Sequence, residues 1–239
     1  MKSKNVMSKH AKGVGAKSKE AIFQSLRADI ISHKLKPGQS IREDVLAQSY
    51  GISRTPIREM LRKLEQEELV KIVPNKGVYV SDLTPKDIAE VLDIRIWLES
   101  AAARSAALKI LPEQLKELAA INAQLDFAIE HQDSIASFEA DTRLHDLILI
   151  ASGNAKVRKI ITNLTGQIHR IRFVSGHKPG RINTTVNEHK QIIAAVMERD
   201  PVKAEEEMRI HLENTKQLMV PSSEMDEKFE AFVRSSYPW

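Results

Sequence analysis

Apolar residues recur three or four positions apart along most of the chain, which is the spacing of one buried face of an α-helix. In the first third, this pattern predicts three short helices, over residues 19–34, over 43–49 and from Ser53 onward. Gly51 precedes the third helix, and a glycine there suits a sharp turn. Two β-branched runs follow and predict a hairpin, with strands over residues 70–73 and 78–80.

After the hairpin the pattern is helical almost to the end of the chain. Thr84 and Pro85 are predicted to begin a long helix, as its capping residue and its first helical residue. Five further helices are predicted, over residues 112–130, 134–151, 156–173, 185–199 and 202–219. The expected fold class is therefore mainly α, with an N-terminal winged helix-turn-helix and a C-terminal antiparallel all-α helical bundle.

The predicted elements divide the chain into two domains and two tails. The predicted segments are a disordered basic tail over 1–17, a winged helix-turn-helix DNA-binding domain over 18–81, a helical metal- and effector-binding domain over 82–221, and a C-terminal tail over 222–239. Ser53 is expected to cap the third helix through its hydroxyl group.

Charge is distributed unevenly between the two predicted domains. Residues 1–81 carry 16 Lys and Arg against 8 Asp and Glu, whereas the remainder carries 20 against 24. A basic head on a mildly acidic body predicts a polyanionic partner, most often nucleic acid. The absence of cysteine excludes disulfide scaffolds and cysteine-ligated metal clusters. Apolar runs are too short for a membrane helix, so a cytoplasmic protein with no membrane partner is expected.

The start of the predicted third helix carries the residues best suited to read DNA. Arg54, Thr55 and Arg58 share one exposed edge, and such residues contact phosphates and base edges in the major groove. Lys76 and Gly77 fall at the tip of the predicted wing, where glycine permits close approach of the backbone.

The string from Leu46-Ala47 through Gly51-Ile52-Ser53-Arg54-Thr55-Pro56-Ile57-Arg58-Glu59 resembles the GntR family of bacterial transcription regulators. The resemblance implies binding of a double-stranded DNA operator by Arg54, Thr55, Arg58 and the wing Gly77. The family usually has an arginine two residues before Leu46, where this chain has Asp44. Either Arg42 replaces that contact or the contact is missing.

Four of the predicted helices place polar residues on apolar faces. The polar residues are Arg95 on the first of these helices, Asp141 and His145 on the second, His189 on the third and His211 on the fourth. Buried polar groups must pair with one another, bind a ligand or line a wet cavity. Three imidazoles and one carboxylate suit Zn²⁺, Mn²⁺, Fe²⁺ or Ni²⁺, with zinc favoured. A packed polar core without metal is the alternative that the periodicity leaves open.

The predicted bundle resembles the FCD-type effector domain of the FadR subgroup. The resemblance rests on Asp93-Ile94-Arg95 with Leu98-Glu99, Asp141-Thr142-Arg143-Leu144-His145, Glu188-His189 and Met208-Arg209-Ile210-His211-Leu212. It implies that Asp141, His145, His189 and His211 hold a divalent metal ion. It also implies that Arg95 helps to bind a small carboxylic acid. Arg172 is expected to be a surface residue, with a second anion contact as the alternative.

The sequence therefore predicts a ligand-responsive transcription regulator that acts as a homodimer. Binding of the metal and the carboxylate would alter its affinity for the operator. The family resemblance implies that the ligand relieves repression. Two alternatives compete with this hypothesis. One is a metal-dependent hydrolase built on the same four ligands, and the other is a metal-free structural regulator that binds DNA.

Overall fold

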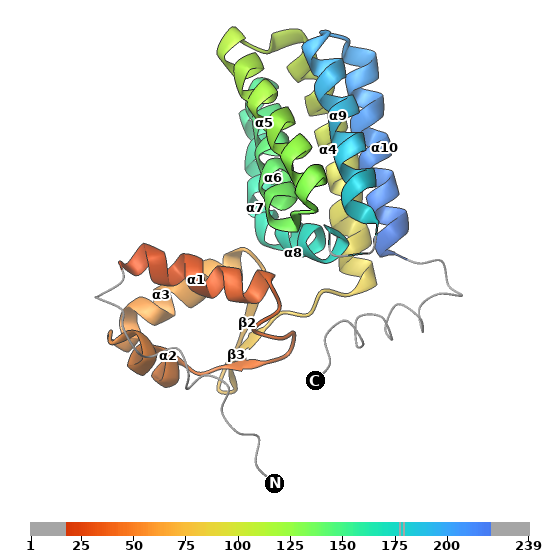
Figure 1. Ribbon diagram of the computed structural model, residues 1–239. Helices are drawn as coiled ribbons and strands as arrows, with labels where there is room; N and C mark the ends of the chain where they lie inside the picture. The colour runs from red at the N-terminus through yellow and green to blue at the C-terminus, as the bar shows by residue number, and fades with distance from the viewer. Residues whose placement is uncertain (1–17, 177, 179, 221–239) are drawn as a thin grey trace. The chain divides into compact units, whose positions relative to one another are not determined.

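The computed structural model describes residues 18–176, 178 and 180–220 (Figure 1). The predicted tails over 1–17 and 222–239 lie outside the described residues. The chain separates into two compact units, with the division between Asp82 and Leu83. Each unit has its own cluster of buried apolar side chains.

The first unit contains three helices and a small sheet. Its elements in chain order are α1 (Lys19–Ile31), β1 (Ser40–Ile41), α2 (Glu43–Tyr50), α3 (Arg54–Gln66), β2 (Val70–Val73) and β3 (Gly77–Val80). The three strands are antiparallel in the order β1-β3-β2. The hairpin of β2 and β3 confirms the predicted strands, whereas the two-residue β1 is too short to leave a periodic signal.

Local sequence explains the turns that bring α2, α3 and the wing together. Gly51 ends α2 in the left-handed conformation, with φ of 66°, which glycine adopts without steric cost. Gly77, with φ of 115°, follows the tip of the wing. Leu61 and Leu64 of α3 are fully buried and anchor this helix on the core of the unit. The other face of α3 is left exposed.

The second unit is an all-α bundle. Its helices are α4 (Pro85–Lys109), α5 (Pro112–His131), α6 (Ser134–Ala151), α7 (Ala155–Asn163), α8 (Thr165–Gly176), α9 (Arg181–Met197) and α10 (Pro201–Met219). Thr84 and Asp87 form a reciprocal capping box at the start of α4, as the sequence predicts for Thr84. The helix α4 packs against α6, α9 and α10, and α5 packs against α6 and α9. The site described below lies among α4, α6, α8, α9 and α10.

Two boundaries in the bundle differ from the sequence prediction. The helix predicted over 156–173 is two helices, because α7 ends at Asn163 and α8 begins at Thr165. The helix predicted from residue 185 begins earlier, at Arg181, directly after Gly180 in the left-handed conformation. Within the described ranges, no helix has the length and apolar character that a membrane span requires.

The separate cores predict separate responses to core truncation. Leu61 and Leu118 are each at most 1% exposed, one in each unit. Replacing either with alanine should destabilise its own unit by about 2–5 kcal/mol, because of the lost burial and the cavity left behind. Calorimetry of Leu61→Ala and Leu118→Ala should show two different parts of the unfolding profile shifting. Identical shifts for both variants would contradict independent cores.

Candidate functional site

The N-terminal end of α3 presents the predicted DNA-reading residues to solvent. Arg54, Thr55 and Arg58 are all exposed there. The expected cap is wrong, because Ser53 makes no side-chain hydrogen bond to the helix. A capping hydroxyl bonds the second or third amide of a helix, and the third residue here is Pro56, which has no N–H. This end of α3 therefore keeps backbone donors that no capping side chain occupies, which suits a phosphate.

Salt bridges set the charges around this surface. Arg58 donates from Nε to Glu43 of α2 at 2.7 Å. Arg42 donates to both carboxylate oxygens of Asp44, at 2.7 and 3.2 Å. Both arginines are exposed, and ion pairs in contact with solvent contribute little to stability. A phosphate can therefore displace either carboxylate.

The wing residues also lie at the surface. Lys76 and Gly77 are exposed in the turn between β2 and β3. The structure thus brings the predicted recognition helix and the predicted wing into one small unit.

Three of the predicted metal ligands converge inside the helical bundle. His145 of α6, His189 of α9 and His211 of α10 are buried, and each offers a ligand atom within 4.8 Å of the other two. The Nε2 atoms of His189 and His211 are 3.3 Å apart. Two imidazoles on a tetrahedral zinc ion, with Zn–N near 2.05 Å, would place their nitrogens about 3.3 Å apart. The donor set and this spacing therefore suit a divalent ion.

Two of the histidines each have a carboxylate next to Nδ1, and this contact determines which ring nitrogen carries the hydrogen. His145 Nδ1 lies 2.5 Å from Glu99 Oε2, and His211 Nδ1 lies 2.8 Å from Glu188 Oε2. An ionised carboxylate only accepts hydrogen bonds, so each Nδ1 must donate. In the neutral ring, Nε2 then carries the free lone pair. Outer carboxylates of this kind orient histidine ligands in metal sites.

Each of these carboxylates is in turn held by an arginine on its own helix. Arg95 Nε donates to Glu99 Oε1 at 2.6 Å. Arg181 donates to both oxygens of Glu188, at 3.1 and 3.2 Å. The bundle therefore contains two chains of contacts of the same kind, each running from arginine to glutamate to histidine.

Burial controls the protonation of the site. Burial lowers the pKa of His145, and it lowers the pKa of His189 and His211 well below the ordinary value. The rings are therefore neutral near pH 7, as metal coordination requires. Burial alone would raise the pKa of Glu99, but Arg95 and His145 outweigh it and hold that pKa well below its usual range. Glu99 is thus ionised.

Asp141, the predicted fourth ligand, lies beside the three histidines. Its Oδ1 atom is 3.5 Å from His145 Nε2, one helical turn away on α6. The same oxygen is 2.9 Å from Nε of Arg172 on α8. Burial tends to raise the pKa of Asp141, but Arg172 and the three histidines lower it below its ordinary value. Asp141 is therefore an anion held next to the cluster.

The arginines differ from expectation. Arg172 is buried rather than at the surface, because α8 buries residues around nearly its whole circumference and has no single polar face. Arg95 is 1% exposed, and its guanidinium group is engaged by Glu99. The contacts of Glu99 and Glu188 with the histidines were not predicted from the sequence. The spacing of Glu99 four residues after an inward-facing Arg95 was the available signal.

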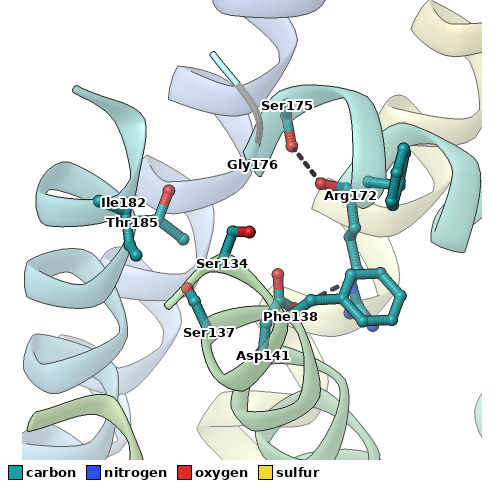
Figure 2. Close-up of a pocket in the computed structure, with 10 residues that line it drawn as sticks. Ser134, Ser137, Phe138, Asp141, Arg172, Ser175, Gly176, Ile182 and Thr185 are labelled. Atoms are coloured by element: carbon teal, nitrogen blue, oxygen red, sulfur yellow. Dashed lines mark hydrogen bonds and ion pairs between the residues drawn. The ribbon is translucent and has the colours of Figure 1, made fainter. Parts of the chain in front are cut away.

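Two cavities adjoin the histidine cluster. A small cavity of about 30 Å³ reaches Asp141 and is lined by Ser134, Ser137 and Thr185. Figure 2 shows these hydroxyl groups around Asp141, with the Arg172 side chain extending to the same carboxylate. A larger cavity of about 290 Å³ reaches His145 and is lined by residues of α6, α7 and α8. The buried site is therefore next to space that a small molecule can fill.

Comparison with known proteins covers both units. The family model described as "Bacterial regulatory proteins, gntR family" matches residues 18–80, and the FCD domain model matches residues 90–214. The HTH-type transcriptional regulator YdhC of Bacillus subtilis is 30% identical, covering 79% of this chain and 85% of that protein. The HTH-type transcriptional repressor RspR of Escherichia coli is 29% identical, covering 81% and 85%.

A solved structure shows the same fold. Escherichia coli McbR/YncC aligns with a TM-score of 0.72 at 20% identity, covering 87% of this chain and 98% of that one. These matches identify a DNA-binding transcriptional regulator and give the hydrolase alternative no support. The chain belongs to the GntR family of bacterial transcriptional regulators and carries an FCD domain.

Proposed function

We propose that this regulator is a ligand-responsive repressor of the FadR subgroup whose helical unit holds a divalent metal ion, with zinc favoured. A small carboxylic acid bound beside the metal changes operator affinity. Two copies act together as a homodimer in the cytoplasm. The proposed metal ligands are Asp141, His145, His189 and His211.

The observation that carries the metal proposal is the arrangement of the imidazoles. In His145 and in His211, Nδ1 is hydrogen-bonded to a carboxylate. The lone pair of each ring is therefore on Nε2, the nitrogen that faces the other histidines. Nε2 of His145 and Nδ1 of His189 are buried and have no hydrogen-bond partner in the described part of the chain. A buried polar group without a partner costs about 1–3 kcal/mol. A cation removes that cost at His145, whereas a purely structural core of three imidazoles would retain it.

Charge balance supports an anionic effector. Each of the three carboxylates around the histidines is paired with one arginine, namely Glu99 with Arg95, Asp141 with Arg172 and Glu188 with Arg181. The histidines are neutral, so a divalent ion adds two positive charges that no further carboxylate of the cluster offsets. Buried charge is costly unless it is compensated. A carboxylate ligand entering with the metal would supply the compensation, and the metal would offer it a coordination position.

The DNA-binding part of the proposal rests on the exposed end of α3 and on the wing. Arg54, Thr55 and Arg58 would contact bases and phosphates, Lys76 and Gly77 would contact the adjacent backbone, and Arg42 would replace the missing contact of Asp44. A homodimer would place two recognition helices on half-sites about 34 Å apart. The relative RspR is a repressor, which supports the proposed sign of regulation. Linkage between ligand and operator binding then follows from one conformational equilibrium.

Arg54→Ala should lower affinity for DNA fragments that the wild-type protein selects from a random pool. We expect a loss of about 1–3 kcal/mol, or roughly 5- to 150-fold in affinity, because a charge-assisted contact is removed. Fluorescence anisotropy measures it. Arg104→Ala, which removes an exposed arginine from α4, should bind normally. Full affinity in Arg54→Ala would refute the assigned recognition helix.

His189→Ala should reduce the metal content of protein purified without a nickel column. Elemental analysis should find about one zinc ion per wild-type chain and a large loss in the variant, because one of three converging imidazoles is gone. His131→Ala changes an exposed histidine of α5 and should leave the content unchanged. Wild-type protein that neither contains nor takes up a divalent metal would favour the metal-free regulator.

Glu188→Gln should weaken zinc binding by about 10–100-fold, because His211 loses the carboxylate that orients its ring. Competition with a zinc-binding dye gives the dissociation constant. Glu130→Gln, at an exposed position of α5, is the matched control. Equal zinc affinity in the two variants would show that Glu188 is not a positioning residue.

A further inference from the structure

Arg172 occupies a position shared by the two cavities of the bundle. It lines the small cavity together with Asp141, and it lines the larger cavity together with His145. Figure 2 shows its side chain running from α8 toward the Asp141 carboxylate. Arg95, for which the family resemblance implies a contact with the effector, lines neither of these two cavities and is held by Glu99. Arg172 is thus the arginine of the cluster with access to a ligand.

Arg172 also contacts the atom that a metal ion would need. Its Nε lies 2.9 Å from Asp141 Oδ1, and that same oxygen lies 3.5 Å from Nε2 of His145. The side of Asp141 that faces the free imidazole nitrogen is therefore taken by a guanidinium group. A metal ion and a guanidinium group at one carboxylate oxygen would be two cations in competition, in a buried setting where their repulsion is poorly screened.

The contact between Arg172 and Asp141 is an ion pair without the alignment of a hydrogen bond. Among the residues that the structure describes, neither Arg172 Nε nor Asp141 Oδ1 has a hydrogen-bond partner, although the two atoms are close. Hydrogen-bond strength falls steeply as donor and acceptor lose alignment. The pair is therefore held mainly by charge, and another cation can replace the guanidinium group without breaking an aligned hydrogen bond.

We propose that Arg172 couples the metal site to an anion site. Without metal, Arg172 neutralises Asp141. When a metal ion takes Asp141, the guanidinium group is released to the larger cavity and binds the carboxylate of the effector. This proposal rests on the proposed metal function and goes beyond it, because it replaces Arg95 with Arg172 as the anion-binding residue and makes the two ligands mutually dependent.

The larger cavity has the chemistry for such a ligand. Thr142, Thr162 and Thr165 contribute to its lining, and the exposed Arg158 lies at its edge. Its volume of about 290 Å³ far exceeds the ~10–15 Å³ that holds a single water molecule on the same measure. A carboxylate that carries hydroxyl groups fits both the charge of Arg172 and the hydroxyl donors around it.

The test compares zinc affinity with and without acetate, the simplest carboxylate, in wild type, Arg172→Gln and Arg104→Gln. In wild type, acetate should strengthen zinc binding, and zinc should strengthen acetate binding by the same factor. Arg172→Gln should bind zinc about tenfold more tightly in the absence of acetate, within the usual range for coupled sites, and should lose the acetate effect. Arg104→Gln removes the same charge from an exposed position of α4 that lines neither cavity, and it should behave as wild type.

Thermal unfolding supplies a second readout. Metal-free Arg172→Gln should melt below wild type because Asp141 loses its counter-ion, and zinc should raise its melting temperature by more than it raises that of wild type. Arg172→Lys keeps a cation near Asp141, so its zinc affinity should stay near that of wild type even if Arg172→Gln folds poorly.

Two results would overturn the proposal while leaving the metal site intact. One is weaker zinc binding in Arg172→Gln, which would mean that the arginine supports the Asp141 ligand instead of competing with the metal. The other is an acetate effect that is absent in wild type or unchanged in Arg172→Gln. Failure of wild type to bind zinc at all would instead overturn the proposed function, and this inference with it.

Discussion

The pairing of buried charges is the constraint on which the helical unit depends. Asp141, Glu99 and Glu188 sit among three neutral imidazoles, and each is balanced by an arginine from the helices of the bundle. An unpaired buried charge costs several kcal/mol, so helix packing and charge pairing must be satisfied together. This requirement fixes the relative rotation of α4, α6, α8, α9 and α10, because each contributes a member of the network.

The network also separates two kinds of task among similar residues. Arg95 and Arg181 lie on the Nδ1 side of His145 and His211, where they hold the glutamates that orient the rings. Arg172 lies on the opposite side, at the Asp141 carboxylate, which is near Nε2 of His145. Residues of one type therefore differ in function according to which side of the imidazoles they occupy. An arginine on the inner face of a bundle helix can therefore serve a neighbouring carboxylate, as Arg95 and Arg181 do.

Much of this arrangement could be predicted from the sequence, and the failures have physical reasons. Helical periodicity placed His145, His189 and His211 on inward faces, because each interrupts an otherwise apolar stripe. The burial of Arg172 could not be predicted in this way, because α8 is buried on nearly all sides and its apolar residues do not mark one inward face. The break between α7 and α8 was missed because the apolar residues Ile161, Leu164 and Ile168 keep helical spacing across it, and Gly166 lies within α8 instead of interrupting that pattern. Pairings between helices, such as Glu188 with His211, depend on packing that one sequence does not specify.

The break between α7 and α8 has a consequence for how a molecule could reach the interior. The helix α7 has nine residues, and Ile161 is its one buried residue, yet it supplies part of the wall of the larger cavity. Short helices with little buried surface open locally at a lower free energy than the body of a domain. The larger cavity already opens to the surface beside the exposed residues Asp146, Arg158 and Thr162. Local opening of α7 would widen this entrance while the histidine-bearing helices keep their packing.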